Sequence, residues 1–169
     1  MKYLAIPLLA LATPAFADSV DIVGNVSAKC IIQTTKSGVF GSPTANKLST
    51  SPSDGGIHPE VRIDVAIANS YTANITHPTT FTSSPSLNDT VTWTGSVSVV
   101  NTSDAAMSSY DTNKTTAGAT TSYSLTTAGS TWFAISSVAE YGGGKPFTGG
   151  TYTAQATICL LYTSPSPRD

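Results

Sequence analysis

The sequence predicts an all-β domain, an antiparallel sandwich of the immunoglobulin-like or jelly-roll kind with about eight or nine strands. Apolar and polar residues alternate with period two along most of residues 18–158, as in strands that are buried on one face. Gly, Pro, Asn or Asp interrupts this alternation at intervals of about ten residues, which is typical of turns. Because no helical periodicity separates these segments, we expect neighbouring strands to pair antiparallel.

The first half of the chain contains the strand with the clearest alternation, residues 61–67. Its apolar face consists of Val61, Ile63, Val65 and Ile67. The longest run, residues 91–99, has Trp93 on its apolar face, and Gly95 is expected to mark a bend or bulge at its middle. The other strands expected in this half are residues 19–26, 29–33 and 71–75.

The second half contains three further expected strands. They are residues 122–126, 131–141 and 151–158. Residues 103–113 break the alternation, and Asp104 is placed to cap a single helical turn. Residues 42–59 are rich in Ser, Pro and Gly and are expected to form one long loop or an excursion at the edge of a sheet.

The N-terminus has the features of a secretory signal peptide, residues 1–17. Lys2 precedes an apolar run at residues 4–12, and Ala15-Phe16-Ala17 has the small-x-small pattern of a cleavage site. The run is too short to cross a bilayer core of about 30 Å. We therefore expect the mature chain to begin at Asp18 and to be secreted, periplasmic or at the cell surface, without a membrane span.

The C-terminal residues 159–169 resemble the translation of a sequencing adapter, and residues 160–169 are expected to carry neither structure nor function. This affects the two cysteines of the chain, Cys30 and Cys159. In an exported protein such a pair predicts a disulfide that closes a long loop. If Cys159 belongs to the adapter, however, Cys30 has no partner in this chain. The two cysteines are too isolated for a zinc site.

Charge and motifs exclude several function classes. The formal net charge is −2 and charged residues make up 11% of the chain, which excludes a basic surface for nucleic acid. The two histidines, His58 and His77, are each followed by Pro, and no Gly-x-Ser-x-Gly or His-Glu-x-x-His motif is present. Residues 142–145 lack the spacing of a phosphate-binding loop and predict a glycine-rich turn. We expect no enzymatic activity, cofactor or metal.

Three stretches resemble exported bacterial fimbrial (pilin) or spore-coat-U-like subunits. These are residues 20–30, which end in a lone cysteine, residues 38–41, and the Gly-x-Tyr strand within residues 149–158. The resemblance implies a non-enzymatic structural subunit of a surface appendage or coat, which associates with copies of itself or with other secreted subunits. In such assemblies an extended segment of one subunit fills the unpaired edge of the next.

Under this resemblance, residues 18–26 are the candidate donor strand, with Val20, Ile22 and Val26 as its apolar residues. The alternation by itself leaves a second interpretation open. The same segment could pair within the sheet of its own chain.

The alternative function is that of a carbohydrate-binding adhesin that uses exposed aromatic residues. Trp132 and Phe133 are adjacent on one expected strand, so one of them has to face outward. If Trp132 does, Tyr110 and Tyr141, in or beside loops, could join it to stack on a glycan. Trp93 is expected in the core instead.

Overall fold

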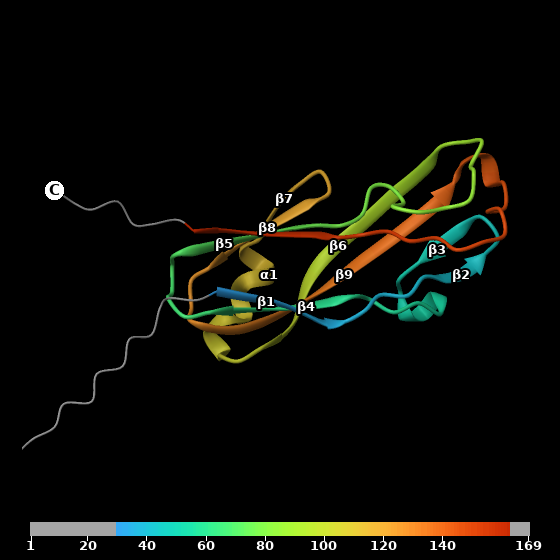
Figure 1. The fold of residues 1–169 in the computed structure, drawn as a ribbon. Helices are drawn as coiled ribbons and strands as arrows, with labels where there is room; N and C mark the ends of the chain where they lie inside the picture. The colour runs from blue at the N-terminus through green and yellow to red at the C-terminus, as the bar shows by residue number, and fades with distance from the viewer. Residues whose placement is uncertain (1–29, 163–169) are drawn as a thin grey trace, which may run out of the picture.

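The computed structural model describes residues 30–162 and has two antiparallel β-sheets, of six and four strands (Figure 1). The prediction of an all-β sandwich is confirmed. Residues from both sheets meet in one buried core. Residues 19–26, expected to form the first strand, lie outside the described residues.

The larger sheet is organised around β9 (Gly129–Tyr141). On one edge, β9 pairs along nearly its whole length with β6 (Val91–Thr102). On its other edge, β4 (Glu60–Val65) pairs with the first half of β9 and β3 (Lys47–Ser49) with the second. The outer strands are β1 (Cys30–Lys36) beside β4 and β2 (Gly41–Thr44) beside β3.

The smaller sheet has the strand order β10-β5-β8-β7. Its strands are β10 (Thr157–Tyr162), β5 (Tyr71–Thr76), β8 (Thr120–Leu125) and β7 (Thr115–Ala117). Strand β10 pairs with β5 as far as Tyr162. The structured part of the chain therefore passes the domain boundary at Ile158 that the sequence predicted. The expectation that residues 160–169 lack structure is wrong for residues 160–162.

The helical segments are short and lie between strands. Asp104 caps the first turn of one of them as expected, because its side chain accepts a hydrogen bond from the Ala106 N–H at 2.8 Å. The helical segments are η1 (Pro52–Asp54), η2 (Ala105–Ser109), α1 (Tyr110–Asn113) and η3 (Gly142–Gly144). The region 42–59 is thus a β2–β3 hairpin at the edge of the larger sheet followed by η1, which corresponds to the expected edge excursion and not to one long loop.

The core confirms the alternation in β4, with one exception. Val61, Ile63 and Val65 are 3%, 1% and 5% exposed, whereas Ile67 is 43% exposed. Strand β4 ends at Val65, and the chain then turns through Asn69, which has a φ of 60°. The prediction that Ile67 shares the buried face is therefore wrong, because the strand ends before it.

Gly95 has a different role from the expected bend or bulge. The register of β6 against β9 continues across Gly95 and shifts only between Val99 and Asn101. A Cβ atom at Gly95 would lie 2.5 Å from the Ser136 carbonyl oxygen and 2.6 Å from Cγ of the His77 ring. Glycine is required here because His77 packs directly on the backbone.

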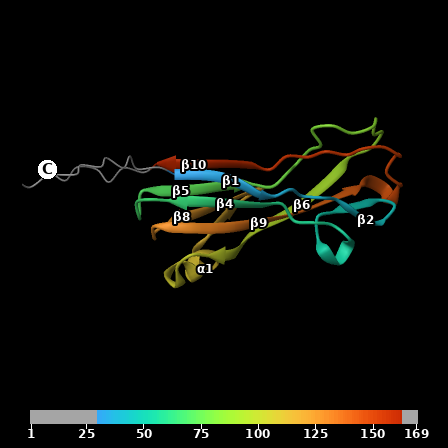
Figure 2. The ribbon, with the colours of Figure 1, turned by 60° about the horizontal axis from the view of Figure 1, so that its bottom comes forward.

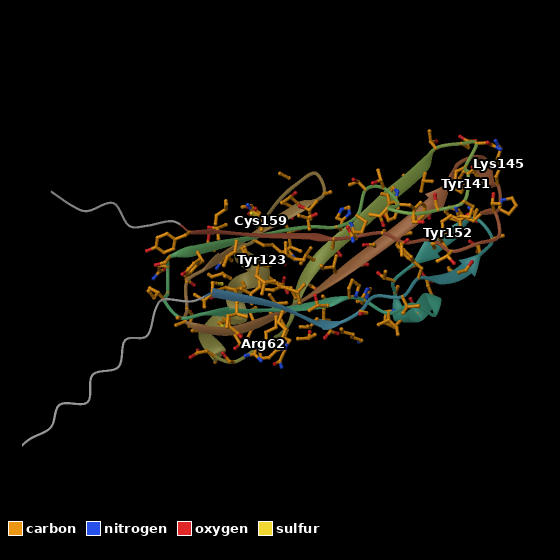
Figure 3. All side chains as sticks on the ribbon, viewed as in Figure 1. Arg62, Tyr123, Tyr141, Lys145, Tyr152 and Cys159 are labelled. Carbon is orange, nitrogen blue, oxygen red and sulfur yellow. The ribbon has the colours of Figure 1, made fainter. Side chains whose placement is uncertain are left out.

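Beyond the main core, six aromatic residues form a second group, which we call the distal aromatic cluster. Its closest pair is Phe81 and Trp93, whose ring centroids are 4.8 Å apart. Trp93 therefore faces inward as expected but is half-buried in this cluster. The members are Phe40, Phe81, Trp93, Tyr141, Phe147 and Tyr152. Figure 3 shows Tyr141 and Tyr152 at the end of the molecule remote from Tyr123.

A polar network fastens α1 to the sandwich near the other end. The Asp111 carboxylate accepts hydrogen bonds from the Val99 N–H at 2.9 Å and from Lys114 Nζ at 3.1 Å. The Tyr123 hydroxyl lies 2.9 Å from the Val97 carbonyl oxygen and 3.2 Å from Asp111 Oδ1. Burial, followed by the Asp111 charge, raises the pKa of Tyr123.

Replacing Gly95 by Ala tests the close approach of His77. We expect Gly95→Ala to lower the free energy of unfolding by about 1 to 3 kcal/mol, because the added methyl group overlaps backbone and ring atoms. Gly149→Ala is the control, since a Cβ there meets nothing within 4 Å. Urea unfolding measures both. Equal stability of the two variants would contradict the assigned role of Gly95.

Replacing Tyr123 by Phe tests the polar network. At neutral pH we expect Tyr123→Phe to cost about 1 to 2 kcal/mol, since a buried hydrogen bond is lost. Because the folded state raises the pKa of Tyr123, this residue stabilises the protein below its unfolded pKa of about 10 and loses that contribution as pH rises further. Urea unfolding at about pH 8 and pH 11 should show the deficit of the variant shrinking, whereas Tyr162→Phe, at an exposed position, shows no such trend.

Candidate functional site

The candidate site lies where the two sheets end side by side. Among residues 30–162, β1 pairs only with β4, and β10 pairs only with β5. Each is therefore an edge strand with one row of backbone N–H and C=O groups left without a strand partner. Figure 2 shows β1 and β10 along the same edge of the sandwich.

The inner face of β1 is uncovered. Ile32 is directly opposite Ile63 in the β1–β4 ladder, and residues opposite each other in an antiparallel pair point to the same face. Ile63 is 1% exposed, as expected of the core, yet Ile32 is 43% exposed. No element of the described chain covers the position of Ile32, although its side chain faces the interior.

Strand β10, at the edge of the smaller sheet beside β1, also has inner side chains that are only partly covered. In the β10–β5 ladder, Ile158 is opposite Ile75 and Leu160 is opposite Ala73. The two β5 residues are fully buried, whereas Ile158 and Leu160 are only half-buried. The extended residues 151–156 continue this pattern towards the distal aromatic cluster.

A cavity of about 190 Å³ lies between these two edges. A second cavity of about 360 Å³ shares Gly38, Val39, Phe40 and Ala154 with it, so the two form one groove, which we call the open-edge groove. The residues that line the first cavity are Thr34, Gly38, Val39, Phe40, Thr50, Pro59, Glu60, Val61, Pro78, Ile135, Ser137, Ala154, Ala156 and Ile158.

The groove is nearly uncharged. Glu60 is the one ionisable residue that lines the first cavity, and its carboxylate is paired with Lys36 Nζ at 3.3 Å. Small residues such as Gly38, Ala154 and Ala156 leave room for larger side chains from outside. An apolar floor between two unpaired strand edges is suited to binding an extended, uncharged segment through main-chain hydrogen bonds.

The two histidines are in separate places and each has a neighbour. His58 Nδ1 is 3.2 Å from Thr50 Oγ1, and His77 Nδ1 is 3.0 Å from the Pro78 carbonyl oxygen. Within the described part of the chain, no three His, Cys, Asp or Glu side chains are grouped as metal ligands would be.

The expected disulfide between Cys30 and Cys159 is not formed, and both residues are free thiols. They belong to different sheets, and Cys30 packs against the core. Cys159 is opposite Asn74 and is exposed on the outer face of β10. Burial and the nearby Asp64 carboxylate raise the pKa of Cys30.

The three aromatic residues proposed for sugar stacking lie in three different surroundings. Tyr110 is 3% exposed in the main core, where its hydroxyl accepts the Thr127 N–H at 3.0 Å. Tyr141 is buried in the distal aromatic cluster. Trp132 is half-buried on the outer face, where the Arg62 guanidinium lies 5.3 Å from the ring centroid. The structure does not bring these residues together as a platform.

The proposed donor residues Val20, Ile22 and Val26 lie outside the described residues. The groove residue Ile158, and Ile32 on the same face of β1 as the groove residue Thr34, were not predicted as a site. One signal was present in the sequence, because Ile31 and Ile32 are adjacent in a strand and so face opposite sides. An adjacent apolar pair in a sheet with one wet face indicates a surface that another segment covers.

Comparison of the chain with models of known protein families, with curated proteins and with solved structures finds no match in any of the three. No helix within residues 30–162 has the length and apolar character needed to cross a membrane.

Thiol alkylation tests the positions of the cysteines. We expect iodoacetamide at neutral pH to modify Cys159 several times faster than Cys30, because Cys159 is exposed while the raised pKa of Cys30 reduces its thiolate fraction. Peptide mass spectrometry after timed quenching measures both rates. In urea the two rates should converge. Protection of both thiols until a reductant is added would indicate a disulfide instead.

Proposed function

We propose that the protein is an exported, non-enzymatic structural subunit of a surface appendage or coat, of the fimbrial kind. Copies assemble when an extended segment of one fills the open-edge groove of the next. The observation that carries this proposal is the uncovered inner face of β1, where Ile32 is 43% exposed opposite a buried Ile63. An exposed edge with apolar side chains favours pairing with a further strand.

The donor segment is residues 18–26 of a second copy. Val20, Ile22 and Val26 alternate with polar residues, as a strand that buries one face in a groove requires. Asp18 is the expected first residue after signal-peptide cleavage, so the donor segment would be the N-terminal segment of the mature chain. The resemblance of residues 20–30 to fimbrial subunits supports the same assignment.

The surface supports close repetition of copies. The outer face of β6 presents a row of exposed hydroxyl residues, Thr92, Thr94, Ser96 and Ser98. With a net charge of −2, neighbouring copies accumulate little like charge, so their mutual repulsion is small. The chain is thus suited to dense packing.

Adjacent isoleucines allow a matched test of assembly. Ile32→Asp places a charge on the inner face of β1, where it would meet the apolar residues of a donor strand. We expect it to reduce assembly of the purified mature protein at least tenfold. Ile31→Asp is the control, because Ile31 is 51% exposed on the opposite face of the same strand.

Electron microscopy and sedimentation velocity at high protein concentration measure the assemblies. Ordered filaments or oligomers should form from the unmodified chain and from Ile31→Asp, but not from Ile32→Asp. A strictly monomeric unmodified chain, or equal assembly by the two variants, would contradict the proposal.

A further inference from the structure

We infer that the protein has a second binding site, a cavity at the β6 edge of the larger sheet, and that its ligand is a neutral carbohydrate. The cavity has a volume of about 240 Å³, and we call it the β6-edge cavity. It shares no residue with the two cavities of the open-edge groove, and it does not include Trp132, Tyr110 or Tyr141. This inference therefore goes beyond the proposed function. The residues that line the cavity are Thr79, Thr80, Phe81, Ser84, Val91 and Trp93.

One part of the free edge of β6 is blocked against pairing with another strand. Strand β6 lies on the side of β9 away from β2 and β3 (Figure 1). The Val97 carbonyl accepts a hydrogen bond from Lys114 Nζ at 2.7 Å, and the Val99 N–H donates to Asp111 Oδ2 at 2.9 Å. Charged side chains thus occupy backbone groups that a further strand would need, which is how proteins protect an edge strand.

The other part of the edge, beside the cavity, is open. The register of β6 against β9 is continuous from Val91 to Val99, so every second residue directs its backbone groups to the same side. Trp93 and Gly95 therefore direct their N–H and C=O groups off the edge, as Val97 does. Within residues 30–162 these groups of Trp93 and Gly95 have no backbone partner. They can bond a small ligand that lies in the cavity.

The Trp93 ring is held in a fixed orientation at the cavity. Its centroid is 4.8 Å from that of Phe81 and 6.3 Å from that of Phe40, with interplanar angles of 65° and 63°. Trp93 is still only half-buried, so part of its ring surface is accessible. A ring that is oriented before binding loses little conformational entropy when a ligand packs on it.

Hydroxyl groups surround this ring. Thr79, Thr80 and Ser84 are exposed, and none of their hydroxyls is hydrogen-bonded to another residue in the described part of the chain. The segment that carries them is anchored, because the Thr82 N–H and hydroxyl donate to the Thr153 carbonyl at 2.8 and 3.1 Å. The cavity thus has a fixed wall with three hydroxyls available to a ligand.

The lining indicates the class of ligand. A pyranose ring has a face of C–H groups that can pack on an indole and a rim of hydroxyls that can hydrogen-bond. Aromatic side chains with a few polar groups around them are typical of small-molecule sites. None of the lining residues is charged, and Asp89, two residues before Val91, is paired with Lys145 Nζ at 2.8 Å. A charged sugar would have no free counter-charge here, so the ligand is neutral.

The size of the cavity limits how much of the ligand it holds. Pockets that enclose a drug-sized ligand have volumes of about 300 to 1,000 Å³. The β6-edge cavity, at about 240 Å³, is smaller and holds a single sugar ring. Further units of an oligosaccharide would lie along the open part of the β6 edge.

The two tryptophans of the chain allow fluorescence to locate the site. Trp132→Phe leaves Trp93 as the one indole, whereas Trp93→Phe leaves Trp132, on the outer face. The probe is an array of neutral and sialylated oligosaccharides, and the neutral oligosaccharide with the strongest signal is then titrated into each variant. We expect a blue shift of the emission on binding in Trp132→Phe and no shift in Trp93→Phe.

A matched pair of threonine substitutions keeps the test decisive if Trp93→Phe impairs folding. Thr80→Val removes a hydroxyl from the cavity, and Thr92→Val removes one from the outer face of β6, and both positions are exposed. We expect Thr80→Val to weaken binding of the same oligosaccharide about fivefold, as the loss of one hydrogen bond does. Thr92→Val should bind it as the unmodified chain does.

The outcomes separate this inference from the proposed function. Binding of no neutral oligosaccharide, a preference for sialylated ones, or equal affinity in Thr80→Val and Thr92→Val overturns the inference. Assembly is decided by Ile32→Asp, which lies on the other edge of the larger sheet and should leave sugar binding unchanged. Loss of assembly and loss of sugar binding are thus measured in different variants.

Discussion

The hydrogen-bond ladders on both edges of β9 organise the whole protein. One edge binds β6 without interruption apart from a single register shift, and the other passes from β4 to β3. The gap between β4 and β3 is closed by direct bonds: the Ile135 N–H donates to the Pro59 carbonyl at 3.0 Å, and the Thr50 N–H donates to the Ser137 carbonyl at 2.9 Å. The long strand β9 thereby contributes side chains both to the main core and to the distal aromatic cluster.

The length of the larger sheet accounts for two regions of the molecule, the distal aromatic cluster and the open-edge groove. The smaller sheet covers only part of it, so the remaining inner surface is covered by loops that contribute the distal aromatic cluster. Those loops contact each other through the bridge between Ser83 and Thr153. Along the β1 edge, no strand or loop within residues 30–162 completes the cover, and the open-edge groove results. The groove is therefore a consequence of how the sheets overlap, more than of any single residue.

Period-two alternation predicted which residues of β4, β5, β8 and β9 face inward, because alternation fixes the face of each side chain. It could not predict which strands pair or which residues meet, since the face of a residue does not determine which strand lies beside it. The disulfide prediction failed for this reason, since Cys30 packs against the core whereas Cys159 is exposed on the outer face of β10. The groove was not predicted from the sequence. Ile32 is exposed because no element within residues 30–162 covers it, and an alternation pattern does not show which elements cover a face. Tyr110 and Tyr141 were misjudged because the first residue of α1 and the last residue of β9 both bury their side chains.

The start of β1 and the end of β10, the two strands that border the groove, lie at the same end of the sandwich (Figure 1). The loop at Gly118 between β7 and β8 is on the far edge of the smaller sheet from β10, and a side chain there would meet no other atom within 4 Å. A fluorescent or affinity tag placed directly before β1 or directly after β10 would therefore crowd the binding edge and disturb its contacts. A tag inserted at this remote loop would report on the protein while leaving that edge accessible.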